Sequence, residues 1–142
     1  MGSMSVKLTT VAHVMTPDPI CITSTITIAE AHGIMTERGF RHLPVVDGKR
    51  LVGVLSTTDI GRLATGVAEL MNKKVAELMT PNPQTIDSGA LVEVAAATLA
   101  ARKINCLPVT KGGELVGIIT TYDLLDALAR QLRSEDPPSQ GS

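Results

Sequence analysis

Apolar and polar positions in the first third of the chain repeat with the spacing of short helices and strands. Apolar residues at helical intervals over 11–15 predict a short helix, which ends before the following Thr-Pro because proline disfavours helical backbone in the residue before it. The alternating run ICIT at 20–23 predicts a short strand. A longer amphipathic helix follows, with Ser24 or Thr25 as its expected cap and Gly39 as its expected end.

Two apolar strands and a second helix complete this pattern. The runs HLPVV (42–46) and LVGVLS (51–56) predict strands, and the DGKR between them is typical of a tight hairpin turn. Because proline cannot donate a hydrogen bond to a neighbouring strand, the first run is expected to meet a sheet edge or a bulge. The helix after the hairpin is predicted to begin at Ser56 or Thr57 and to run through Leu63.

The whole pattern occurs twice without a gap. VAHVMTPDP (11–19) matches VAELMTPNP (75–83), and the 18 residues from 42 match those from 106, at one offset of 64 residues (11 to 75, 42 to 106). Such a repeat indicates two copies of one supersecondary unit, each with the order helix, strand, helix, strand, strand, helix. We therefore predict an α/β (α+β) fold in which two tandem β-α-β-β-α units pack with pseudo-twofold symmetry.

The repeat sets the expected domain boundaries. Unit 1 is predicted to cover 8–65 and unit 2 to cover 75–132, with a linker at 66–74 that can be helical. The segment 133–142 has no aliphatic or aromatic residue and contains two prolines, so it is expected to be a disordered tail.

The composition limits the classes of function open to the chain. Hydrophobic residues make up 44% and charged residues 19%, with a formal net charge of -1, as is typical of a globular protein. This balance offers no electrostatic attraction for nucleic acid, and Phe40 and Tyr122, the only aromatic residues, are too few for a base-stacking surface. No apolar run approaches the roughly 20 residues of a membrane span, so neither nucleic acid nor membrane is an expected partner.

Cysteine content and motifs argue against a disulfide scaffold and against an enzyme. Cys21 and Cys106 are too few for such a scaffold, and both fall in apolar strands, where buried thiols are expected. We therefore expect a protein of the reducing cytoplasm. No nucleophile motif, phosphate loop or metal-ligand spacing is present in the sequence, so we assign no catalytic residue and no metal ligand.

One motif in each unit could carry chemistry. A glycine and two apolar residues precede a hydroxyl and a carboxylate that are three residues apart, Ser56 with Asp59 and Thr120 with Asp123. This is the spacing of a helix capping box, so the motif caps two helices, holds a ligand, or does both. The two acids occupy equivalent positions of a repeated unit, and would therefore form two sites rather than one catalytic pair.

Together these motifs resemble the CBS (cystathionine β-synthase) domain. The resemblance covers about residues 8–130, and its doubling resembles a CBS pair, or Bateman module, of the stand-alone type. It implies a regulatory sensor without catalysis, which binds AMP, ADP, ATP or S-adenosylmethionine in clefts between the units. No cofactor is required, Mg²⁺ can accompany the nucleotide, and the partners implied are a second copy and an unidentified target protein.

The resemblance also implies which residues contact the ligand. In the family the motif carboxylate binds the ribose hydroxyls, which carries over here to Asp59 and Asp123. Ribose and phosphate contacts are implied for Ser56, Thr57, Asp59, Thr120, Thr121 and Asp123. Base contacts, largely through backbone and apolar groups, are implied for Ile20, Ile22, Thr23, Leu43, Pro44, Gln84, Ile86, Leu107 and Pro108. Arg41 and His42 occupy a position that lies near the ligand phosphates in related pairs.

The phosphate ends of the two units differ in charge. Unit 1 offers Arg41, His42 and Lys49, where unit 2 offers Asn105, Cys106 and Gly113. A guanidinium forms bidentate pairs with phosphate that asparagine and cysteine cannot copy. We therefore expect two unequal clefts, of which the one reached by Arg41 favours the more highly phosphorylated ligand.

Two classes of function remain open at this point, a nucleotide sensor and a ligand-free dimeric adaptor with degenerate pockets. The intact hydroxyls of Ser56 and Thr120 favour the sensor. A homodimer is expected in either case, because the helical segments 27–35 and 91–101 are rich in small apolar residues that allow helices to approach closely.

Overall fold

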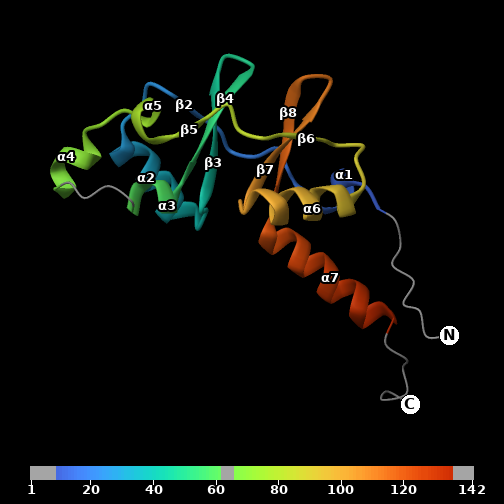
Figure 1. Cartoon of the computed structure of the whole chain (residues 1–142). Helices are drawn as coiled ribbons and strands as arrows, with labels where there is room; N and C mark the ends of the chain where they lie inside the picture. Colours follow the sequence, from blue (N-terminus) through green and yellow to red (C-terminus); the bar gives the residue numbers. More distant parts are fainter. Residues whose placement is uncertain (1–8, 62–65, 136–142) are drawn as a thin grey trace.

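Two four-stranded sheets stand side by side, and the computed structural model describes residues 9–61 and 66–135 (Figure 1). One sheet has the spatial order β2 (Ile22–Thr23), β3 (His42–Asp47), β4 (Arg50–Ser56) and β5 (Thr80–Pro81). The other has the order β6 (Ile86–Asp87), β7 (Cys106–Lys111), β8 (Glu114–Thr120) and β1 (Thr16–Pro17). In each, a parallel strand joins an antiparallel hairpin, which confirms the predicted class and order of elements.

The first strand of each unit belongs to the sheet of the other unit. β1 pairs antiparallel with β8, and β5 pairs antiparallel with β4. The short helices before them, α1 (Val11–Val14) and α5 (Val75–Leu78), are exchanged as well. Val11 is fully buried in the core of unit 2, and Val75 is fully buried in the core of unit 1. The N-terminal helix and strand of each sequence repeat therefore pack in the core of the other unit.

Helices cover one face of each sheet (Figure 1). They are α2 (Ile28–Arg38) and α3 (Thr57–Gly61) on unit 1, α4 (Val67–Met71) between the units in sequence, and α6 (Val92–Arg102) and α7 (Thr121–Glu135) on unit 2. The cores beneath them have equivalent centres, all fully buried: Leu43, Val45 and Leu55 in one and Leu107, Val109 and Ile119 in the other. This equivalence is the pseudo-twofold symmetry that the gapless repeat predicts.

The cap of α2 differs from the expected one. Thr27, rather than Ser24 or Thr25, is the cap: its hydroxyl accepts from the Glu30 N–H at 3.2 Å, and the Glu30 carboxylate accepts from the Thr27 N–H at 3.1 Å. This reciprocal pair satisfies two free donors at once, which a lone hydroxyl cannot do. The Ser24 hydroxyl instead donates to Asp47 at 2.9 Å. The expected helix end at Gly39 is confirmed, with a left-handed φ of 72°.

α7 extends further than expected, whereas the linker contains a helix, as the sequence allows. α7 continues to Glu135, because its backbone ladder runs on past the last apolar residue, so 133–135 are not part of a disordered tail. The linker contains α4, whose Leu70 is buried in the core of unit 1. The rest of the predicted tail (136–142) and the predicted end of the first unit's last helix (62–65) lie outside the described residues.

A glycine makes each strand exchange possible. A Cβ on Gly117 would lie 3.0 Å from the Thr16 carbonyl oxygen of β1 and would also overlap the Met15 side chain. Gly53 has the same relation to Met79 at the β4–β5 crossing. In each unit the repeated glycine of one strand therefore contacts the repeated Met-Thr of the strand that comes from the other unit.

Gly117→Ala is expected to lower the free energy of unfolding by about 1–3 kcal/mol, because the new methyl group overlaps backbone that cannot move without breaking the β1–β8 pairing. Urea denaturation measures this loss. Gly33→Ala is the control, since a Cβ there has no neighbour within 4 Å and alanine favours the α2 helix by about 0.5–1 kcal/mol. Equal stability of the two variants would show that the crossing does not require glycine.

Candidate functional site

Both copies of the repeated hydroxyl–carboxylate motif are capping boxes. The Ser56 N–H donates to Asp59 Oδ2 at 2.9 Å, and the Asp59 N–H donates to Ser56 Oγ at 3.0 Å. The Thr120 N–H donates to Asp123 Oδ2 at 2.9 Å, and the Asp123 N–H donates to Thr120 Oγ1 at 3.2 Å. The capping role is therefore confirmed for α3 and α7, and the question becomes whether either carboxylate has capacity left for a ligand.

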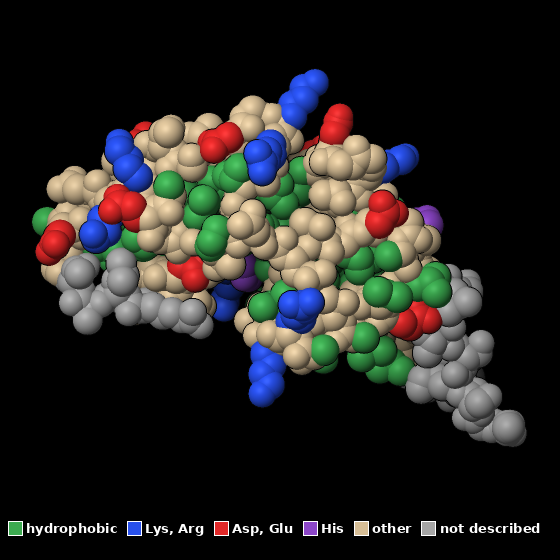
Figure 2. All heavy atoms as spheres, turned by 45° about the horizontal axis from the view of Figure 1, so that its top comes forward, with side chains coloured by type: hydrophobic (Ala, Val, Ile, Leu, Met, Phe, Trp, Pro, Cys, Tyr) green, Lys and Arg blue, Asp and Glu red, His purple; other side chains and the backbone are tan. Residues whose placement is uncertain are grey.

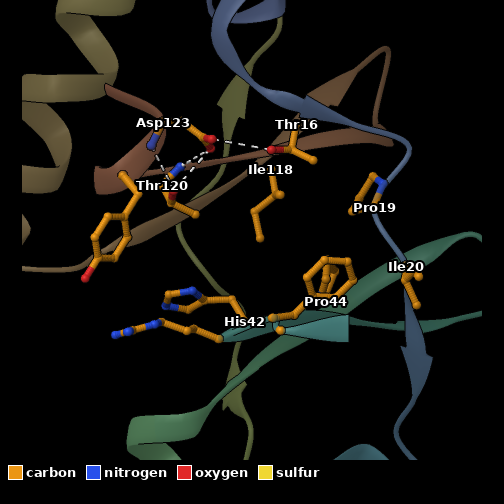
Figure 3. A pocket seen from close by; sticks show the side chains of 12 residues that line it. Thr16, Pro19, Ile20, His42, Pro44, Ile118, Thr120 and Asp123 are labelled. Carbon is orange, nitrogen blue, oxygen red and sulfur yellow. Dashed lines mark hydrogen bonds between the residues drawn. The ribbon is translucent and has the colours of Figure 1, made fainter. Parts of the chain in front are cut away.

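A cleft of about 320 Å³ lies between the two units (Figure 3). Its apolar residues are Pro19, Ile20, Phe40, Pro44 and Ile118, and Ile118 lies on the side opposite Pro44. Pro44 lies one residue before the start of the β2–β3 pairing and one residue before the β3 bulge, so its missing N–H leaves no gap in a ladder. The predicted position beside an edge or bulge is confirmed.

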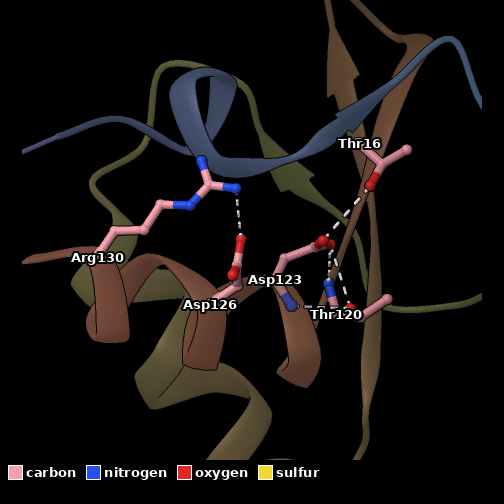
Figure 4. A network of polar contacts seen from close by, with 5 residues as sticks. All are labelled: Thr16, Thr120, Asp123, Asp126 and Arg130. Carbon is pink, nitrogen blue, oxygen red and sulfur yellow. Dashed lines mark hydrogen bonds and ion pairs between the residues drawn. The ribbon is translucent and has the colours of Figure 1, made fainter.

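The polar end of the cleft centres on Asp123. Its Oδ2 is used by the cap, whereas its Oδ1 lies 3.4 Å from the Thr16 hydroxyl, which donates to it (Figure 4). Because a carboxylate has about four acceptor positions, Asp123 can cap α7 and still accept hydrogen bonds from a ligand. Thr16 comes from β1 and is brought here by the strand exchange.

Two cationic or titratable side chains complete the polar end. Arg41 and His42 both line the cleft, although they come from unit 1 and Asp123 comes from unit 2. The Arg41 guanidinium carbon lies 5.4 Å from the centre of the Tyr122 ring, which also lines the cleft. Thus most apolar residues of the cleft and its cation belong to unit 1, whereas the carboxylate belongs to unit 2.

Only some of the predicted residues have side chains in this cleft. Of the base set it holds Ile20 and Pro44, and of the ribose and phosphate sets it holds Thr120, Asp123, Arg41 and His42. The side chains of Ile22, Leu43, Ile86 and Leu107 are buried in the cores, so a ligand could reach these residues only through their backbone. Thr23 and Gln84 are exposed and do not line it.

Thr57 and Thr121 already have backbone partners. The Thr57 N–H donates to the Arg41 carbonyl and the Thr121 N–H to the Asn105 carbonyl, each at 3.0 Å. The Thr121 hydroxyl donates to the Asn105 side chain at 3.3 Å, on the side of a different groove between α6 and α7. These two residues therefore tie each motif helix to the loop before β3 or β7.

Lys49 does not join the phosphate end, contrary to expectation. His42 pairs with Ser56 at one end of the β3–β4 hairpin, and Asp47 pairs with Arg50 at the other, beside the turn that holds Lys49. Lys49 lines a separate hollow near the turn of the β7–β8 hairpin. The whole length of the hairpin thus separates Lys49 from Arg41.

The remaining predicted residues lie at positions equivalent to those of the cleft, 64 residues away along the chain. For Ile20, Arg41, His42, Tyr122 and Asp123 the residues 64 positions away are Gln84, Asn105, Cys106, Thr58 and Asp59. Ser56 and Asp59 keep the cap geometry, and Pro108, like Pro44, is a buried strand residue. The hydroxyl–carboxylate motif is therefore the same in both halves of the molecule, whereas Arg41 and His42 have Asn105 and Cys106 as their counterparts.

Burial sets the protonation of the two equivalent strand residues. Burial lowers the pKa of His42 below its ordinary 6.5; the negative charge of Asp59 partly opposes this, and the positive charge of Arg41 adds to it. Burial raises the pKa of Cys106 to about 12, with a further contribution from the charge of Asp123. His42 is thus neutral and Cys106 a protonated thiol at neutral pH. Cys21, expected to be buried, is exposed beside Pro19.

Sequence reasoning missed Thr16, Phe40 and Tyr122 as cleft residues. Thr16 carried a signal, because it recurs as Thr80 in the repeated Met-Thr-Pro, but only the strand exchange brings it to Asp123. Tyr122 stands inside the repeated motif and has Thr58 as its counterpart. Its departure from the repeat was the available signal.

Comparison with known proteins identifies the family. A family model described as the CBS domain matches residues 11–65 and again 75–130. The chain belongs to the CBS-domain family. The crystal structure of the CBS domain pair of protein MJ0100, in complex with 5′-methylthioadenosine and S-adenosyl-L-methionine, is 30% identical, with a TM-score of 0.78 over 88% of this chain and 99% of that one. CBSX2 in complex with AMP is 30% identical, with a TM-score of 0.72 over 85% and 96%.

Curated relatives place CBS pairs in proteins of different length. The inosine-5'-monophosphate dehydrogenase of Korarchaeum cryptofilum is 32% identical over 108 residues, which is 75% of this chain and 22% of that protein. The uncharacterized protein YlbB of Bacillus subtilis is 29% identical over 119 residues, 82% of this chain and 80% of that one. The chain therefore spans less than a quarter of the first relative and most of the second.

The described part of the chain lacks two other kinds of feature, a membrane-spanning helix and a metal-binding cluster. No helix within 9–61 and 66–135 is long and apolar enough to cross a membrane. The same residues hold no cluster of three or more His, Cys, Asp or Glu side chains arranged to bind a metal ion. On the face seen in Figure 2, basic and acidic side chains are interspersed rather than gathered by sign.

The lowered pKa of His42 predicts a contribution to acid sensitivity. Between 6.5 and the lower folded-state value, the unfolded chain binds a proton that the folded chain resists, so stability is complete above pH 6.5 and falls as the pH drops below it. His42→Gln should therefore show a shallower loss of melting temperature from pH 7.5 to 5.5 than the parent. His32→Gln, at an exposed position of α2, should keep the parent slope. Identical slopes for His42→Gln and the parent would contradict the prediction.

Proposed function

We propose that this CBS pair is a regulatory sensor that binds an adenosine-containing ligand, AMP, ADP, ATP or S-adenosylmethionine, in the cleft between its units. The observation that carries the proposal is Asp123 Oδ1, which accepts only one long hydrogen bond, from Thr16 at 3.4 Å, and lines a cleft that also holds apolar residues and a guanidinium. The adenosine compounds in complex with the two related proteins, CBSX2 and MJ0100, support the same class of ligand. The role is regulatory rather than catalytic, since no residue of the cleft is a prepared nucleophile.

Each part of an adenine nucleotide has a complementary surface in the cleft. The base fits between Ile118 on one side and Ile20 and Pro44 on the other, and the ribose hydroxyls can donate to Asp123. The phosphate then lies toward Arg41, whose guanidinium can form a bidentate pair with it. A volume of about 320 Å³ falls in the range of small-molecule sites, about 300–1,000 Å³.

A second ligand position is proposed around Asp59. Ser56 and Thr57 begin α3 there, and Gln84 and Pro108 take the places of Ile20 and Pro44. Asn105 and Cys106 replace the cation and the imidazole, so this position lacks the phosphate partner of the first. We propose that it accepts the adenosine part of a ligand and discriminates less among phosphate forms.

Asp123→Ala is expected to weaken AMP binding about tenfold to a hundredfold, because charged hydrogen bonds of about 1.5–3 kcal/mol are lost. Its stability should fall by about 0.5–2 kcal/mol through the lost cap. Titration calorimetry measures the first effect and thermal unfolding the second. Asp126→Ala is the matched control, because Asp126 lies one turn further along α7 and pairs with Arg130 at 3.0 Å (Figure 4). If both variants bind AMP like the parent, Asp123 is only a cap.

A homodimer is also proposed, and an apolar groove supports it. A hollow of about 700 Å³ runs between α6 and α7, lined by residues such as Val92, Ala96, Leu125 and Leu128. Leu125, Leu128 and Leu132 recur at helical spacing on α7 and are 43–55% exposed. A second copy can cover such a stripe with the same stripe of its own, as a twofold interface requires. The predicted segment 91–101 contributes α6 to this face, whereas the exposed side chains of 27–35 include Glu30 and His32.

Leu128→Glu is expected to convert a dimer into a monomer at micromolar concentration, because a carboxylate would be buried in the apolar face without a partner. Sedimentation velocity measures the change. Arg130→Glu places the same charge on the opposite side of α7 and should leave the dimer intact. A monomeric parent, or a dimeric Leu128→Glu variant, would rule out this face.

A further inference from the structure

Arg41 and Tyr122 meet across the cleft from different units. Arg41 lies in the loop before β3, and Tyr122 is in the first turn of α7. The guanidinium carbon is 5.4 Å from the ring centre, within the roughly 6 Å of a cation–π contact. Both residues line the cleft, and Tyr122 is 62% exposed. The ring therefore lies at the solvent side of the cleft rather than in a core.

Other contacts hold the Arg41 backbone but leave its charge without an acidic partner. The Arg41 carbonyl accepts from the Thr57 N–H at 3.0 Å, which fixes the loop against α3. Among the described side chains, those of 9–61 and 66–133, the ion pairs are Lys73 with Glu77 and Arg130 with Asp126. The ring has no strong hydrogen-bond acceptor, so the contact leaves the N–H donors of the guanidinium available to an anion.

We propose that Tyr122 is a positioning residue, which holds the Arg41 guanidinium ready for the ligand phosphate. The inference rests on the proposed function, because it assigns the phosphate end of the same cleft. An arginine side chain has many rotamers in solution, and a contact that restricts them before binding lowers the entropy lost on binding. Tyr122 acts on the phosphate through Arg41 and does not contact the base or the ribose.

The other half of the molecule lacks this device. Thr58 and Asn105 stand where Tyr122 and Arg41 stand, and the Asn105 side chain accepts from the Thr121 hydroxyl at 3.3 Å. Neither a ring nor a cation is present at these two positions. The chain itself thus supplies a replacement that removes the ring, the threonine found at the equivalent helix position.

Calorimetry with adenosine, AMP and ATP on the full chain tests the assignment. Tyr122→Thr should weaken AMP and ATP about twofold to fivefold, the range of an exposed cation–π contact, and leave adenosine unchanged. Tyr122→Phe keeps the ring and should bind all three like the parent. In an Arg41→Ala background, Tyr122→Thr should have no further effect on any of them. An equal loss for adenosine, or additive losses with Arg41→Ala, would overturn the inference.

A second measurement separates this inference from the proposed function. Tyr122 is the only tyrosine and the chain has no tryptophan, so tyrosine fluorescence reports on this residue alone. Inorganic tripolyphosphate should change that fluorescence in the parent and not in Arg41→Ala. If it does so while no adenosine compound binds, the proposed function fails and the Arg41–Tyr122 anion site stands. If it has no effect on the parent while AMP binds, the inference is wrong and the function stands; if neither binds, both are wrong.

Discussion

The exchange of the first strand between the two units is the constraint on which the rest of the structure depends. β1 reaches β8, and β5 reaches β4, only because Gly117 and Gly53 leave room for the Met15 and Met79 side chains. The exchange brings Thr16 to Asp123 and closes one side of the cleft. Without it, each unit would keep its own capping box, but Thr16 would not reach the carboxylate of unit 2.

Under the proposed function, a ligand in the shared cleft would contact both units at once. Ile20, Pro44 and Arg41 come from one repeat, and Thr120 and Asp123 come from the other, so a ligand that touches both sets holds the two units in one relative position. A ligand present at about 100 times its dissociation constant would add about 2.7 kcal/mol to the stability of that arrangement. Under the proposed function, this is the physical link between the presence of a nucleotide and the state of the protein.

The sequence predicted the features that local patterns encode. Hairpins, capping boxes and the doubled order of elements depend on neighbouring residues, and the gapless repeat made each of them visible twice. The exchange could not be predicted, because a two-residue strand such as β1 carries no pattern that selects its partner. The predicted cap of α2 was wrong. Thr27 and Glu30 have capping-box spacing, but the hydroxyls of Ser24 and Thr25 come earlier in the chain and also fit a cap. Lys49 was predicted beside Arg41 from its charge alone. The hairpin instead places it at the turn, at the end opposite to His42.

The two halves of the molecule differ where the proposed ligand carries its charge. Asp59 and Asp123 are held by the same cap geometry, so the ribose is offered the same acceptor in both. A neutral adenosine would meet similar chemistry at either position, whereas a phosphate would meet Arg41 at one and Asn105 at the other. Discrimination between phosphate forms then depends on one loop residue and the ring that faces it. The carboxylate that caps each helix is less free to change, because its loss would cost stability and, under the proposed function, binding as well.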